Sequence, residues 1–189
     1  MAKFFGNLKA VVAVGFVAAL AMLFWTNSLD NLSGWMTFLH VISGVMWIGL
    51  LYYFNFVQIP TMPAVPADLK PGVTKYIAPK ALFYFRWAAL ATVITGLLVA
   101  ILKGYAHEAF TFQPGVRLIG VGMYLALIMA INVWFVIWPN QKKALGLVEA
   151  APDVKAKAGV TAMIFSRINT LLSIPMLFAM VLQNLGGAL

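Results

Sequence analysis

Long apolar runs separated by short polar stretches make up most of this chain. Five runs reach about 20 residues, the length at which an α-helix crosses the hydrocarbon core of a bilayer. They cover residues 8–26, 33–58, 81–103, 116–138 and 160–183. The pattern predicts an all-α integral membrane protein, a bundle of five transmembrane helices that forms a single domain over residues 1–189.

The first run has a second interpretation, because Lys3 and Lys9 precede an alanine-rich apolar stretch, as in a signal peptide. Bulky Leu23, Phe24 and Trp25 follow the small residues, and no small-x-small cleavage site comes before the next run. We therefore expect this segment to be a retained helix.

Positions four and three residues apart in the second run fall on one face of a helix. These positions are His40, Gly44, Trp47, Leu51, Phe54 and Gln58. Haem needs an axial imidazole and a small residue that lets the macrocycle approach the backbone, so His40 is a candidate metal ligand. Gly44 would leave the gap and Trp47 would form a wall. The alternative is that His40 only hydrogen-bonds another helix, since ionisable groups inside membranes are rare but not usually metal ligands.

Composition narrows the class of protein and of cofactor. The chain is 63% hydrophobic and 10% charged, with a mean hydropathy of +0.93, which excludes a soluble domain. The absence of cysteine excludes disulfides, iron–sulfur clusters and covalently attached c-type haem. The net charge of +8 does not indicate nucleic acid, because the basic residues stand at the ends of apolar runs.

The distribution of basic residues predicts the orientation. One set of connections contains Lys3, Lys9, Lys70, Lys75, Lys80, Lys142, Lys143, Lys155 and Lys157, whereas the other contains only Lys103 and Arg117. The positive-inside rule then places the amino terminus in the cytoplasm and the carboxyl terminus in the periplasm of a bacterial inner membrane. Five prolines predict that residues 60–79 form a non-helical cytoplasmic loop.

With this orientation, polar side chains separate by leaflet. His40 lies in the external half, and the cytoplasmic half contains Asn55, Arg86, Asn132, Arg167 and Asn169. Every acidic residue is in a loop, so the two arginines lack matching carboxylates. They either snorkel to lipid phosphate or face the bundle and form an anion site with the three asparagines, whose amides both donate and accept.

Four stretches resemble a known family. They begin at His40 (HVISGVMWIGLLYYFNFVQ), Pro79 (PKALFYFRWAALATVITGLL), Asn132 (NVWFVIWPNQKK) and Ser166 (SRINTLLSIPMLFAM). Together they are similar to the membrane domain of the cytochrome c-dependent urate oxidases, the urate oxidase N-terminal family, over residues 33–183. The His-x6-Trp-x-Gly portion alone also resembles the haem-b-binding membrane protoporphyrinogen oxidases.

The resemblance implies urate oxidation with electrons passing to a cytochrome c. The chain ends at Leu189 without a haem c motif, so a separate acceptor is expected. The positions that match the family motifs are His40, Trp47, Asn55, Arg86, Asn132, Asn140, Arg167 and Asn169. In this hypothesis Arg86, Arg167, Asn132 and Asn55 are catalytic. Substrate binding is assigned to Arg86, Arg167, Asn169 and Asn140, and haem b is held by His40 beside Gly44 and Trp47.

Three functions stay open at this point. The first is a redox protein that oxidises urate or a similar anion and passes electrons through haem b to an external cytochrome. The second is a non-catalytic accessory subunit of a larger membrane respiratory or oxidase complex. The third is a small organic-anion transporter, which leaves His40 unexplained. The second axial ligand is equally open: His107, His40 of a second subunit in a homo-oligomer, five-coordinate iron or no iron.

Overall fold

The computed structural model describes residues 1–184, and this part of the chain is helical throughout, with no strand. Five helical stretches in it are long and apolar enough to cross a membrane, which confirms the predicted number. They are Leu8–Trp25, Leu32–Ala64, Lys70–Leu102, Arg117–Ala144 and Pro152–Gln183. Insertion into a bilayer and orientation within it remain predictions, and residues 185–189, which include the predicted periplasmic terminus, lie outside the described part.

The chain divides into two compact units, Met1–Trp35 and Met36–Leu189. The first contains α1 (Ala2–Phe5) and α2 (Leu8–Trp25). The Asn7 side chain caps α2 by accepting a hydrogen bond from the amide of Ala10 at 3.3 Å. No residue of α2 is buried, so this apolar helix has no packed face inside its own unit.

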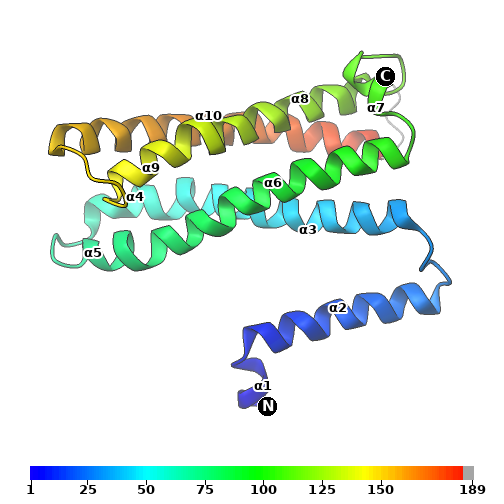
Figure 1. Ribbon diagram of the computed structural model, residues 1–189, viewed down its shortest axis with the longest axis horizontal. Helices are drawn as coiled ribbons and strands as arrows, with labels where there is room; N and C mark the ends of the chain where they lie inside the picture. Colours follow the sequence, from blue (N-terminus) through cyan, green and yellow to red (C-terminus); the bar gives the residue numbers. More distant parts are fainter. Residues whose placement is uncertain (185–189) are drawn as a thin grey trace. The chain divides into compact units, whose positions relative to one another are not determined.

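Four long helical stretches form the second unit and run side by side, each reversing the direction of the one before it (Figure 1). The first is α3 (Leu32–Tyr52), continued by η1 (Tyr53–Gln58), α4 (Ile59–Thr61) and η2 (Met62–Ala64). The second comprises α5 (Lys70–Gly72), η3 (Val73–Ile77) and α6 (Ala78–Leu102).

The short α7 (Ala106–Phe110) precedes the third stretch, which comprises α8 (Arg117–Ile131), η4 (Asn132–Ile137) and α9 (Trp138–Ala144). The fourth stretch is α10 (Pro152–Asn184). Neighbours in sequence are therefore neighbours in space, joined by short connections at alternate ends of the unit (Figure 1).

The core of the second unit uses the predicted stripe of α3. Trp47 and Leu51 are fully buried and Phe54 is 5% exposed. The opposing positions on the other stretches are Leu82, Phe85, Ala89, Met129, Val133, Ile137 and Met176. These buried residues recur at steps of three and four, because only that spacing keeps one face of a helix turned toward its partners.

The second unit contains three π-helical segments, and one of them, η3, lies within the predicted loop at residues 60–79. The segments η1, η3 and η4 each end two residues before a proline, at Pro60, Pro79 and Pro139. A proline lacks the N–H donor and its ring clashes with the carbonyl four residues earlier; we attribute the wider π turn to relief of that clash.

The expectation that residues 60–79 are non-helical is therefore wrong for most of them. Pro60, Pro63, Pro71 and Pro79 each stand in the first two positions of a short or long helix. Pro71 follows a turn at the start of its stretch, where its missing N–H has no intrahelical partner, whereas Pro60, Pro63 and Pro79 lie within continuous helical stretches.

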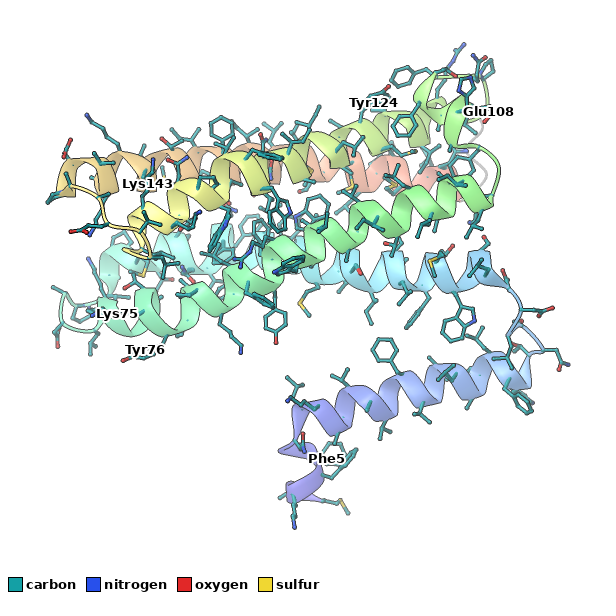
Figure 2. The ribbon with its side chains drawn as sticks, in the orientation of Figure 1. Phe5, Lys75, Tyr76, Glu108, Tyr124 and Lys143 are labelled. Atoms are coloured by element: carbon teal, nitrogen blue, oxygen red, sulfur yellow. The ribbon has the colours of Figure 1, made fainter. Side chains whose placement is uncertain are left out.

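The lysines gather at one end of the second unit. Figure 2 shows Lys75 and Lys143 at the end where α5 and α9 lie, and Glu108 and Tyr124 at the opposite end. This arrangement supports the orientation that the sequence predicts, with the lysine-rich end in the cytoplasm.

Candidate functional site

His40 is held in one orientation by α6. Its Nδ1 lies 2.9 Å from the carbonyl oxygen of Thr92. A carbonyl oxygen only accepts, so Nδ1 carries the proton and donates it. The other ring nitrogen, Nε2, is then the unprotonated atom and has its lone pair available as a ligand.

Gly96, one turn further along α6, makes room for the imidazole. A Cβ atom at Gly96 would lie 2.7 Å from Cε1 of His40 and 2.9 Å from its Nδ1, closer than side chains pack. Gly44 faces the same helix, and a Cβ there would lie 3.8 Å from the methyl carbon of Thr92. Small residues on both helices thus let the ring sit between them.

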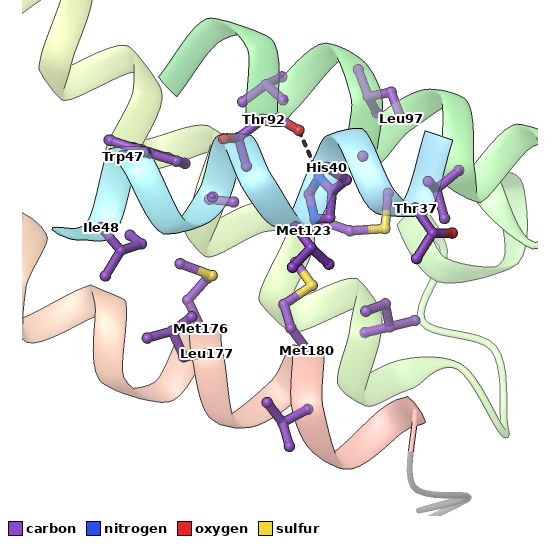
Figure 3. Close-up of a pocket in the computed structure, with 18 of the residues that line it drawn as sticks. Thr37, His40, Trp47, Ile48, Thr92, Leu97, Met123, Met176, Leu177 and Met180 are labelled. Atoms are coloured by element: carbon purple, nitrogen blue, oxygen red, sulfur yellow. Dashed lines mark hydrogen bonds between the residues drawn. The ribbon is translucent and has the colours of Figure 1, made fainter. Parts of the chain in front are cut away.

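A cavity of about 610 Å³ opens beside His40, between α3, α6, α8 and α10 (Figure 3). Its walls include the predicted cofactor residues His40, Gly44 and Trp47 together with Thr92 and Gly96. Methionines from two other helices, Met123, Met176 and Met180, complete the far side. Ligand pockets commonly measure about 300–1,000 Å³, so the cavity has room for a cofactor.

Two polar groups stand where the cavity reaches the end of α6. The helix ends in a Schellman motif: the amides of Gly104 (φ +75°) and Tyr105 bond the carbonyls of Ile101 and Ala100. This turn brings Lys103 and Tyr105 to the cavity wall. Burial raises the pKa of the Tyr105 hydroxyl, so it stays a neutral donor at physiological pH.

Trp47 is the fully buried member of the cavity wall. Its indole Nε1 has no hydrogen-bond partner within the described residues. Buried N–H groups are rarely left unpaired, and this donor is one of four buried side-chain polar atoms without a partner in the described part of the chain.

The asparagines of the other half of the unit bond to one another and to α10. Asn132 donates to Asn169 at 2.9 Å, and Asn169 donates to the carbonyl of Met129 at 2.9 Å. Asn55 donates to the hydroxyl of Ser166 at 2.8 Å and to the carbonyl of Leu51. The structure therefore joins three of the predicted polar residues to the core, not to an open cavity.

A tyrosine–serine pair continues this seam toward the cavity. Ser173 donates to the carbonyl of Thr170 at 2.7 Å and lies 3.0 Å from the hydroxyl of Tyr52. Because the single Ser173 proton is used, Tyr52 is the donor of the second bond.

The side-chain oxygens of Asn55 and Gln58 stay buried without a partner among the described residues.

The two arginines are placed differently from each other. The Arg86 guanidinium stacks 3.8 Å from the ring of Trp138 and lies 5.5 Å from that of Phe83. Arg167 is exposed, and within residues 1–184 no hydrogen bond, ion pair or ring contact involves it. Asn140 donates only to the carbonyl of Val136 in its own turn. Within the described residues no hydrogen bond or ring contact joins Arg86, Arg167 and Asn140 directly to one another.

Several cavity residues escape sequence reasoning. No distinctive motif surrounds Thr92, Gly96, Lys103, Tyr105 or Met123. They are identified as cavity residues because they line the same cavity as His40. A signal did exist for Thr92 and Gly96, which continue the buried stripe Leu82, Phe85, Ala89 of α6 at steps of three and four. In residues 1–184 no group of three or more His, Asp or Glu side chains forms a metal site, so any metal would rely on His40 and softer donors.

The comparison with known proteins bears on the helices opposite His40. Residues 105–186 match the family described as urate oxidase N-terminal, and this confirms the resemblance over that segment. No curated protein and no solved structure matches the chain. The matched segment includes α8, η4 and α10, and hence Asn132, Arg167 and Asn169 as well as the methionines of the cavity. The similarity to the urate oxidase N-terminal family thus extends over residues 105–186.

Proposed function

We propose that the protein is a membrane redox protein related to urate oxidase. It oxidises urate or a similar anion at the lysine-rich end of the second unit and passes electrons through haem b to a separate cytochrome. The observation that carries the proposal is the His40 ring, oriented by the carbonyl of Thr92 and facing a cavity of about 610 Å³.

The residues of the cavity fit a haem. A backbone acceptor on Nδ1 is the usual second partner of a metal-ligating histidine, since it fixes the tautomer and makes Nε2 more basic. Valine, isoleucine, leucine and methionine side chains supply the apolar walls that a porphyrin needs. The indole ring of Trp47 adds an aromatic part to the same wall.

The end of the cavity also fits the polar edge of a haem. Lys103 would pair with a propionate and Tyr105 would donate a hydrogen bond to one, because both line the cavity where α6 ends. When bound, haem b would supply one-electron transfer. The chain's part is to hold the iron through His40, exclude water with the apolar wall and place the propionates near the surface.

Substrate contact is assigned to the opposite half. Stacking on Trp138 uses the face of the Arg86 guanidinium and leaves its N–H donors in the plane of the group. Exposed Arg167 would add positive charge, and Asn55, Asn132, Asn169 and Asn140 would orient the anion. The side-chain oxygen of Asn55 has no partner in the described part of the chain, and as an acceptor it would receive an N–H of the substrate.

The first test is spectroscopic. We expect the protein, purified in mild detergent from cells with ample haem, to show a Soret band that shifts on reduction. The absence of a Soret band under these conditions would overturn the haem assignment.

The second test is catalytic. Urate-dependent reduction of added cytochrome c should occur with the wild-type protein and fall in Arg86→Ala and Arg167→Ala. Arg117→Ala is a matched control, because Arg117 bonds only the carbonyl of Phe112 at the opposite end of the unit. Rates unchanged in both Arg86→Ala and Arg167→Ala would refute the substrate site.

One observation favours the alternative function of an accessory subunit. Of the 18 residues of α2 only Lys9 is charged and none is buried, as expected of a helix that packs against another membrane protein. Purification of the native assembly separates the two functions. Stable association with a large redox complex, without a chromophore in this chain, favours the accessory subunit.

A further inference from the structure

Three methionine side chains face the cavity from the helices opposite His40. Met123 comes from α8, and Met176 and Met180 come from α10 (Figure 3). Thioether sulfur is a soft ligand that binds haem iron opposite an imidazole. The cavity therefore contains both kinds of donor that a six-coordinate haem of the His/Met type requires.

The three methionines are not equivalent in their packing. Met176 is 5% exposed and belongs to the hydrophobic core of the unit. The methyl carbon of Met180 lies 3.3 Å from the position a Cβ would take at Gly122, so it fills the contact between α8 and α10. The side chains of Met176 and Met180 thus both pack in contacts between helices.

Met123 is only half-buried and lies outside that core cluster. It lines the same cavity as His40, although it belongs to a different helix (Figure 3). An unbranched side chain with three rotatable bonds can move to let a flat group enter between it and the imidazole.

His107 does not compete for this position. It lies on α7, is exposed and is not part of the cavity wall. Within residues 1–184 His40 is the one histidine that borders the cavity, so a second imidazole would have to come from another subunit.

We propose that Met123 is the second axial ligand of a haem b bound through His40. This inference rests on the haem assignment made above and goes further by naming the ligand pair. Thioether ligation favours ferrous iron and raises the reduction potential relative to bis-histidine ligation. The bound haem would then be suited to equilibrate with a cytochrome of similarly high potential.

The test compares four purified haem-loaded proteins: wild type, Met123→Leu, Met123→His and Met180→Leu. We expect wild type to be low-spin and to show the weak far-red charge-transfer absorption of a thioether–Fe(III) bond. Met123→Leu, which nearly conserves volume, should keep the haem, become high-spin and bind carbon monoxide faster. Met123→His should restore the low-spin state, lose the far-red absorption and have a lower reduction potential.

Met180→Leu is the matched control and should keep the wild-type spectrum, as should Met176→Leu. A wild-type haem that is high-spin, or low-spin without the far-red absorption, overturns the inference while leaving the haem assignment intact. A low-spin far-red spectrum that persists in Met123→Leu also overturns it. Wild-type protein that binds no haem overturns both proposals, whereas loss of urate-dependent activity alone affects only the substrate proposal.

Discussion

The two halves of the second unit surround their polar side chains in opposite ways. Around His40, glycine and threonine on α3 and α6 leave a cavity of about 610 Å³. Around Asn132 and Asn169 the helices are filled by Phe54, Phe85 and Ile137, and the amides are used in helix-to-helix bonds. The comparison shows that His40 borders a cavity, whereas the amides of the other half are used in contacts between helices.

The difference predicts different consequences of mutation in each half. Changes near His40 should alter what the protein binds and leave the fold largely intact. Changes in the asparagine half should alter the stability of the helix contacts.

The largest effect is expected from His40→Ala. Removing the imidazole takes away the proposed iron ligand, so the Soret absorbance of the purified protein should be lost. His107→Ala is the control and should retain full absorbance, because His107 is exposed and outside the cavity wall. Equal haem content in both variants would contradict the role of His40.

Gly96→Ala should have the next largest effect. The added Cβ would lie 2.7 Å from Cε1 of His40 and would push the ring away from the carbonyl of Thr92. We expect several-fold weaker haem retention, measured by transfer to apomyoglobin, with helical content unchanged. Gly15→Ala is the matched control, since a Cβ there meets no atom within 4 Å and Gly15 lies on α2, outside the cavity wall. Retention that is the same in the two variants would show that the imidazole does not depend on this gap.

A smaller effect is expected in the asparagine half. The bond between Asn132 and Asn169 joins η4 to α10, and a double-mutant cycle with alanine should give a coupling of about 0.6 kcal/mol, with about 1.7 as an upper value. Unfolding in mixed detergent micelles measures it. Asn140→Ala should couple to neither, because Asn140 bonds only within its own turn. A coupling indistinguishable from zero would mean that the pair does not hold the helices together.

The smallest differences should separate the two arginines. Arg86→Ala loses the stacking on Trp138 and should cost about 0.5–2 kcal/mol of stability. Arg167→Ala removes an exposed side chain and should stay within about 0.5 kcal/mol of wild type. The same unfolding titration compares them, and a larger loss for Arg167→Ala would show that its guanidinium packs against the bundle.

The predictions that depend on the spacing of apolar residues and on the length of apolar stretches are confirmed. The stripe from His40 to Gln58 is the buried face of its helix at Trp47, Leu51 and Phe54, since a step of three and four residues has one geometrical consequence on an α-helix. The depth of Arg167 was a weaker guide. Buried Ala162, Ser166, Asn169, Ser173 and Met176 follow the same step along α10, and that pattern alone puts Arg167 outside the stripe.

The proline-rich segment shows a different kind of limit. Counting prolines predicted a loop at residues 60–79, but the outcome depended on where each proline fell in its helix. Pro79 opens α6 because the π turn before it removes the clash with the preceding carbonyl. A π turn stabilised by packing against neighbouring helices leaves little trace in the local sequence.

By itself, the sequence determined the five apolar stretches, the charge difference between the two ends and the face of α3 that carries His40, because each depends on one segment at a time. The tertiary structure decided that Thr92 orients the imidazole and Gly96 makes room for it. It also decided that Met123 lines the same cavity as His40 and that Asn132 bonds to Asn169. These contacts depend on how separate helices are rotated and offset against one another, and no single segment encodes that.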